Sequence, residues 1–225
     1  MHAYYDGEKR LITDEIIFEQ YLDPKKTAVI TIDMHEGHLS DDPDCPAPSP
    51  RGKEIIEPIN KFVTNCRSMS IPIIHVRSVL RRDGSDDING NKSAWRIMSS
   101  FREQPPENLD AHGIEGSKWI EFSVDVQPSD YQIDSKKRLS AFYVTDLELL
   151  LRNIKKETII LVGALTDCCV LNTSSDGANR DFRVVVPKDL TRGNAQLEAS
   201  ALQIIARYFG LVVESDDLLA HWAER

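Results

Sequence analysis

The sequence has few cysteines, and none of them is spaced as a metal-binding or redox pair. The four cysteines of the 225-residue chain stand at positions 45, 66, 168 and 169, without a CxxC or a Cys/His zinc spacing. This pattern argues against a disulfide framework and against a cysteine-based zinc module. Free thiols are typical of a reducing compartment, so we expect a cytoplasmic protein.

Long apolar runs and an excess of basic residues are also lacking. No stretch approaches the roughly 20 apolar residues of a membrane-spanning helix, and residues 1–10 lack the pattern of a signal peptide. Lys and Arg number 27 against 36 Asp and Glu, which gives a formal net charge of −9. We therefore expect neither a membrane partner nor a nucleic-acid partner, because phosphate binding draws on clustered Lys and Arg. A small-molecule substrate stays compatible with this charge, since a pocket can oppose the global sign.

What the sequence does contain is a regular alternation of short apolar runs and helical patterns. Runs rich in apolar and β-branched residues predict buried strands at 27–33, 71–77, 157–163, 183–187 and 211–214, and the less apolar stretch 131–135 is a further strand candidate. Helical spacing of apolar residues appears between them, for example at 54–69 and 194–208. This order predicts a three-layer α/β/α fold with a Rossmann-like parallel sheet of about six strands. We expect a single domain, 1–225, with its core at about 27–214 and an N-terminal extension at 1–26.

Two segments interrupt this rhythm and are expected to be loops. Residues 40–50 contain four prolines and three aspartates, and residues 81–130 hold large aromatic side chains without a long periodic run. Loops beyond the strand ends build the ligand sites of α/β proteins. Trp95 and Trp119 are therefore candidates for a pocket wall, although such aromatics also serve simply to anchor loops.

A cysteine at a strand-to-helix junction is the sharpest local feature. The segment 163–170, Gly-Ala-Leu-Thr-Asp-Cys-Cys-Val, follows a predicted buried strand and precedes a helical pattern. The free N–H groups of a first helical turn lower the pKa of a thiol, and the thiolate is the nucleophilic form. The same N–H groups can stabilise a developing oxyanion. The alternative is a small cysteine packed in a tight turn.

Two charged features complete a possible mechanism. Asp33 ends the predicted strand 27–33, at the edge where open parallel sheets bind ligands; a loop-capping aspartate is the alternative. Residues 134–142 form a basic cluster, which alone would be a solvated charge run. Together they fit a site in which a carboxylate takes a thiol proton, a lysine keeps that carboxylate ionised, and the thiolate attacks a carbonyl.

These segments resemble the isochorismatase-like cysteine hydrolases, a family that includes nicotinamidases, N-carbamoylsarcosine amidohydrolase and ureidoacrylate amidohydrolase. The resemblance runs from about residue 27 to about residue 213 and rests on the strand ending in Asp33, on 136–148 and on 163–170. It implies a hydrolase that cleaves the C–N bond of a small amide, carbamoyl or ureido substrate through a thioester. It implies no cofactor, and a homo-oligomer, either dimer or tetramer. Hydrolysis of an ester or a vinyl ether, and a catalytically silent binding or scaffold protein, are the alternatives.

The resemblance also implies individual roles. The family's catalytic triad carries over as Asp33, Lys136 and Cys169, because the family's nucleophile directly precedes the valine, here Val170. Cys168 fills a variable position and is expected to be a packed, inert thiol. Lys136 is preferred over the adjacent Lys137 because it stands six residues before Phe142, as the family's lysine does.

A cis peptide bond and the histidines near Asp33 belong to the same comparison. The resemblance implies a cis bond between Ala164 and Leu165, which would direct the Leu165 N–H, beside that of Cys169, at a substrate carbonyl oxygen. His35 stands where many relatives have glutamine and is expected to line the pocket. Nicotinamidases bind a metal through an Asp-x-His after the second strand and a further histidine downstream, but residues 77–84 here contain no histidine. We therefore expect no metal of that type; a different metal site at His35 and His38 is the less favoured alternative.

Overall fold

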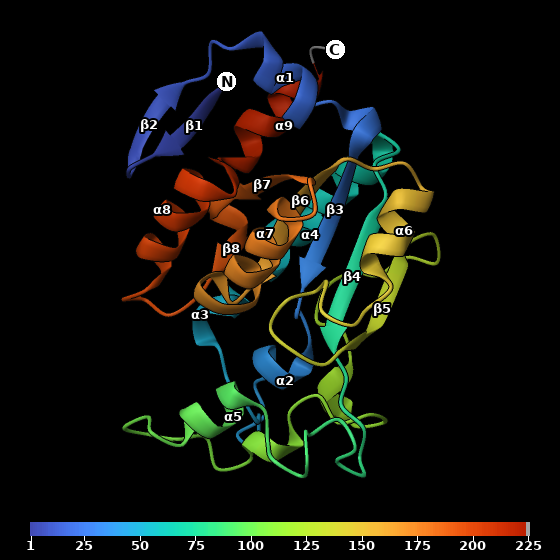
Figure 1. Cartoon of the computed structure of the whole chain (residues 1–225), viewed down its shortest axis with the longest axis vertical. Helices are drawn as coiled ribbons and strands as arrows, with labels where there is room; N and C mark the ends of the chain where they lie inside the picture. The colour runs from blue at the N-terminus through green and yellow to red at the C-terminus, as the bar shows by residue number, and fades with distance from the viewer. Residues whose placement is uncertain (224–225) are drawn as a thin grey trace.

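The computed structural model describes residues 1–223 and is built around a sheet whose core consists of parallel strands (Figure 1). The parallel strands lie in the order β9-β7-β6-β3-β4-β5. Their bounds are β3 (Thr27–Ile32), β4 (Ile73–Ser78), β5 (Tyr131–Lys136), β6 (Thr158–Ala164), β7 (Arg183–Pro187) and β9 (Gly210–Val213). Each coincides with one of the six predicted strands, so the prediction of a parallel sheet of that size is confirmed.

Helices cover both faces of this sheet, and the central strands show why. Val29 of β3 belongs to one hydrophobic cluster, whereas Ala28 and Ile30 belong to the other, because successive side chains of a strand point to opposite faces. The first cluster is closed by α1 (Glu15–Tyr21), α4 (Ile56–Ser68) and α9 (Ser215–Ala223). The second is closed by α6 (Leu147–Asn153), α7 (Leu171–Ala178) and α8 (Glu198–Tyr208). The predicted three layers are thus present.

The sheet is wider than predicted because a hairpin extends one edge. Strands β1 (His2–Tyr5) and β2 (Glu8–Leu11) pair antiparallel, and β1 continues the sheet beside β9. The short β8 (Thr191–Arg192) pairs with β6. β2 is exposed along its length and β1 is mostly half-buried, and neither is an apolar run of the kind that marks the core strands. Asp6-Gly7, with φ values of 52° and 80°, forms its turn.

The two predicted loop regions gather beyond the carboxyl ends of the strands, at the bottom of Figure 1. The segment 40–50 runs between two short helices, α2 (Glu36–Leu39) and α3 (Pro50–Lys53). The segment 81–130 carries only short helices, namely α5 (Ala94–Ser99), η2 (Leu109–Ala111) and η3 (Lys118–Ile120). Three further short turns are η1 (Pro24–Lys26), the π-helical η4 (Thr166–Val170) and η5 (Lys188–Leu190). None of the helices in the described part of the chain has the length and apolar character that crossing a bilayer requires.

Candidate active site

The candidate site lies where four parallel strands end. Asp33 follows β3, Ser78 ends β4, Lys136 ends β5, and Cys169 lies in η4, directly after β6. Because parallel strands point the same way, their carboxyl ends meet at one edge of the sheet. Asp33 adopts a left-handed backbone conformation, with φ of 51°, as the chain leaves β3. The three residues of the predicted triad, far apart in the sequence, are thereby brought to one place.

Lys136 connects the other charged and nucleophilic groups of this site. Its ammonium donates a hydrogen bond of 2.6 Å to Asp33 Oδ2 and lies 3.5 Å from Cys169 Sγ. The adjacent Lys137 points elsewhere: it donates to the Val79 carbonyl and pairs with Asp86. Of the two lysines, Lys136 is therefore the one that contacts both Asp33 and Cys169.

Ser78 is a member of the site that the sequence did not reveal. Its backbone N–H and its hydroxyl both donate to Asp33 Oδ1, at 2.9 and 3.1 Å, and its hydroxyl accepts from Lys136 at 2.8 Å. The serine thus holds one carboxylate oxygen of Asp33 while Lys136 holds the other. Only the register between β3 and β4 places it there, and a single serine after a predicted strand carries no such signal.

The carboxylate and the ammonium are both charged despite complete burial. Burial alone would raise the pKa of Asp33, but the charge of Lys136 and the hydrogen bond of the Cys169 thiol hold it well below its usual range. Burial would likewise lower the pKa of Lys136, yet the neighbouring Asp33 raises it above its usual value. An ion pair this deep is stable only while both partners are present.

The two adjacent cysteines differ in exposure and in acidity. Cys169 is 8% exposed, and the pKa of its thiol is raised well above the usual value by its hydrogen bond with Cys168, by burial and by Asp33. The predicted lowering by the helix start is therefore wrong, because these local effects outweigh a turn whose Cys168 and Val170 amides already donate to Leu165 O. The hydrogen bond with Cys169 lowers the pKa of Cys168, which is partly exposed and lines the pocket. Cys168 is therefore not the fully packed thiol that we expected.

The turn before Cys169 has the expected cis peptide bond between Ala164 and Leu165. Gly163 precedes it with φ of 118°, and a Cβ there would lie 2.3 Å from the Ile32 carbonyl oxygen, so only glycine fits. Leu165 lines the pocket, whereas Ala164 is fully buried and does not.

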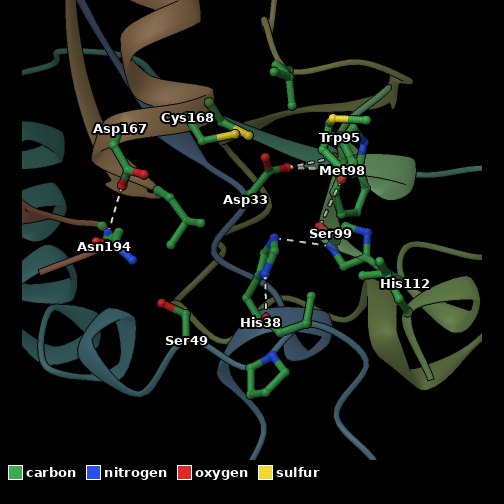
Figure 2. Close-up of a pocket in the computed structure, with 18 of the residues that line it drawn as sticks. Asp33, His38, Ser49, Trp95, Met98, Ser99, His112, Asp167, Cys168 and Asn194 are labelled. Carbon is green, nitrogen blue, oxygen red and sulfur yellow. Dashed lines mark hydrogen bonds between the residues drawn. The ribbon is translucent and has the colours of Figure 1, made fainter. Parts of the chain in front are cut away.

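These groups open into a pocket of about 870 Å³ (Figure 2). Trp95 lines it, as predicted, and Arg51 and Arg102 bring positive charge to its wall. Trp119 and His35 were expected at the wall but are not among the residues that line it. Both are buried, and the His35 ring turns inward because its Nδ1 bonds to the Trp119 carbonyl oxygen at 2.8 Å.

Three histidines lie together beside the pocket, and two of them, His38 and His112, line it. His35, His38 and His112 offer ring nitrogens that lie within 4.8 Å of one another. Burial and the neighbouring histidines lower the pKa of His35 to about 3 and hold that of His112 well below its usual value. The pKa of His38 is also lowered by burial. All three imidazoles are therefore neutral.

A nicotinamidase-type metal site does not fit this chain. The segment after β4, Ser78 to Leu80, offers neither a carboxylate nor an imidazole, and Ser78 is already bonded to Asp33. His112 was missed because it comes from the long aperiodic segment 81–130, whose path cannot be read from a local pattern.

Comparisons with known proteins agree with these features. The family model described as the isochorismatase domain matches residues 27–217. N-carbamoylsarcosine amidase from an Arthrobacter species is 29% identical over 166 residues, 73% of this chain and 58% of that protein, so the chain spans little more than half of it. Ureidoacrylate amidohydrolase RutB of Methylobacterium radiotolerans is 27% identical over 208 residues, 85% of this chain and 77% of that protein. A cysteine hydrolase from Pseudomonas syringae pv. phaseolicola shares the fold, with a TM-score of 0.78, 24% identity, and coverage of 90% of this chain and 94% of that one.

Proposed function

Because the chain belongs to the isochorismatase family of hydrolases, we propose that it cleaves the C–N bond of a small amide, carbamoyl or ureido compound with Cys169 as nucleophile. One observation carries this proposal. The ammonium of Lys136, at the pocket, contacts both the carboxylate of Asp33 and the thiol of Cys169. That arrangement is suited to nucleophilic acyl transfer. The amide-cleaving relatives named above support the choice of bond.

The first step moves the thiol proton of Cys169 to Asp33. The pKa of Asp33 is lowered and that of Cys169 is raised, and both directions disfavour a free thiolate, so the proposed proton transfer accompanies attack on the carbonyl carbon. The ammonium of Lys136, 3.5 Å from Sγ, stabilises negative charge on the sulfur as it develops. The N–H groups of Leu165 and Cys169 are the proposed donors to the substrate oxyanion.

The second half of the reaction returns the proton. Asp33, now protonated, gives it to the departing nitrogen, so that ammonia or an amine leaves and a thioester remains on Cys169. Water, deprotonated by Asp33, then attacks the thioester and releases the acid, and the thiol regains its proton. Ser78 and Lys136 hold the carboxylate oriented throughout, through the three hydrogen bonds that they donate to it.

The pocket suits a small substrate. Its volume of about 870 Å³ falls within the roughly 300–1,000 Å³ of small-molecule sites. Arg51 and Arg102 lie on its wall, so an anionic group on the substrate would meet positive charge there despite the acidic chain.

A panel of small amides, carbamoyl compounds and ureido acids, assayed for released ammonia or amine, tests the proposal. We expect turnover of at least one compound, and a loss of about 1,000-fold or more in Cys169→Ala. The matched control is Cys66→Ala, whose thiol lies on the buried face of α4 and does not line the pocket. Absence of turnover across the panel, or equal activity in Cys169→Ala and Cys66→Ala, would contradict the proposal.

A further inference from the structure

The three histidines form a compact group that the proposed reaction does not use. His35 and His38 come from the segment after β3, and His112 follows η2 in the long loop region. The centroids of their rings are 4.5 to 5.3 Å apart. They are 0%, 8% and 3% exposed, respectively, and Figure 2 shows His38 and His112 meeting at the pocket wall. Three neutral imidazoles are thus gathered where water has little access.

Backbone carbonyls fix the orientation of two of these rings. His35 Nδ1 lies 2.8 Å from the Trp119 oxygen, and His38 Nδ1 lies 2.9 Å from the Ala47 oxygen. A carbonyl can only accept, so each Nδ1 carries the proton and each Nε2 keeps a lone pair. The Gly37 amide also approaches His35 Nδ1, at 3.1 Å, but the shorter contact with the carbonyl requires the proton. Metal-binding histidines are commonly held in this way, with the second ring nitrogen donating to a carbonyl.

Two ring nitrogens of this group lack a partner, and the others near the pocket are bonded only to each other. His35 Nε2 and His112 Nδ1 are buried and have no hydrogen-bond partner among the described residues. His38 Nε2 and His112 Nε2 lie 3.1 Å apart and share a hydrogen bond in the metal-free protein, in which His112 donates to the His38 lone pair; a bound metal ion would replace that proton. Ligand nitrogens around a tetrahedral Zn²⁺ ion lie about 3.3 Å apart, as follows from Zn–N bonds of about 2.0–2.1 Å. The separation of these two nitrogens is therefore already close to that of two ligands sharing one ion.

We propose that His35, His38 and His112 together bind a divalent transition-metal ion, with Zn²⁺ as the best match. An all-imidazole donor set favours Zn²⁺, Co²⁺ or Ni²⁺ over Mg²⁺ and Ca²⁺, which prefer oxygen ligands. Three protein ligands leave a coordination position open, and His38 and His112 both line the pocket, so that position faces it. This ligand set differs from that of the nicotinamidases, whose metal is bound by an Asp-x-His after their second strand. Here two of the three ligands, His35 and His38, come from the segment after β3.

Asp33 lies beside this site without belonging to it. Its Oδ1 is 3.9 Å from His35 Nε2, and the hydrogen bonds from Ser78 already occupy that oxygen. The open position therefore takes water or a substrate atom at the pocket.

Metal binding can be measured without any substrate, so the outcome is independent of the proposed reaction. We would strip the full-length protein with a chelator, dialyse it, and titrate it with Zn²⁺ and with Co²⁺. The expected results are one Zn²⁺ per chain by elemental mass spectrometry, a rise in Tm on Zn²⁺ addition, and the intense visible bands of tetrahedral Co²⁺.

Variants then test the ligands. His112→Gln and, separately, His38→Gln should each weaken Zn²⁺ binding by at least about 100-fold and abolish the Co²⁺ bands. His2→Gln, in the distant hairpin strand β1, is the matched control and should bind as the unchanged protein does. Circular dichroism of each metal-free variant establishes that it is folded, and two separate ligand variants guard against one that is not. A folded unchanged protein that binds no Zn²⁺ and shows no Co²⁺ bands, or a folded ligand variant that binds as tightly as His2→Gln, would overturn the proposal.

Discussion

Removing the charge of Lys136 should destabilise the fold by an amount that the structure allows us to state. Lys136→Met keeps most of the side-chain volume but leaves the Asp33 carboxylate buried without its cation, with Ser78 and the Cys169 thiol as its remaining hydrogen-bond partners. Removing one partner of a buried ion pair costs about 3–5 kcal/mol. For a chain of this size, that cost lowers the Tm by roughly 6–20 °C.

The adjacent lysine provides the matched control. Lys137→Met removes a partly exposed pair with Asp86 at 3.6 Å and should cost only about 1 kcal/mol. The double variant Asp33→Asn with Lys136→Met removes both buried charges and should be more stable than Lys136→Met alone.

Urea unfolding followed by circular dichroism gives the free energy of unfolding of all four proteins, and the m-value checks that unfolding stays two-state. Equal losses in Lys136→Met and Lys137→Met would refute the argument that the Lys136–Asp33 pair is a buried, mutually dependent unit. Strict additivity in the double variant would refute it as well.

Three further predictions concern neighbouring features. Gly163→Ala should lower the free energy of unfolding, measured in urea, by about 3 kcal/mol or more, because the new Cβ meets the Ile32 carbonyl at a φ of 118°. Gly84→Ala, at a φ of 75° with open space around it, should lower it by about 1 kcal/mol. Equal losses in the two variants would contradict this argument. Ser78→Ala should lower kcat/KM by about 10- to 100-fold, because it removes a hydrogen bond to the Asp33 carboxylate. The control Ser100→Ala, at an exposed position, should leave kcat/KM unchanged. A fully active Ser78→Ala would exclude a positioning role for the Ser78 hydroxyl. Iodoacetamide should label Cys168 first as the pH is raised from about 6 to 9, because the lowered pKa of this thiol yields thiolate at lower pH. Burial raises the pKa of Cys66 to about 12, so Cys66 should react later. Peptide mass spectrometry that finds Cys66 or Cys169 labelled ahead of Cys168 would contradict these directions.

The central fold could be predicted because its signals are local. Five apolar runs became parallel strands, since strands buried on both faces must be almost continuously apolar. The sixth strand, β5, lies at the edge of the sheet and is mostly polar and exposed. The hairpin β1–β2 was not predicted, because the exposed side chains of β2 need no apolar pattern. Its turn, Asp6-Gly7, is a hairpin signal by itself. Sequence patterns therefore found the buried strands better than the edge of the sheet.

The site was predictable in part for a similar reason. Asp33, Lys136 and Cys169 each lie at or just after the carboxyl end of a strand, and the common direction of parallel strands brings such positions together. Ser78 and His112 depend instead on strand register and on the path of a long loop, neither of which a local pattern encodes.

The acidity of Cys169 could not be predicted from its place at a helix start. The pKa depends on what the tertiary fold brings near the sulfur, here Asp33 and the Cys168 thiol, and both oppose the thiolate. The same environment is the reason that the proposed proton transfer to Asp33 accompanies attack on the substrate.

The central claim is that Cys169 forms the covalent bond with the substrate. Rapid acid quenching of the protein during turnover of its best amide substrate, followed by peptide mass spectrometry, tests it most directly. We predict an acyl mass increment on the peptide that contains Cys169, with fragment ions placing it on Cys169 rather than Cys168, and no increment in Cys169→Ala. Turnover that continues at an unchanged rate in Cys169→Ala, or an adduct confined to Cys168, would contradict the account.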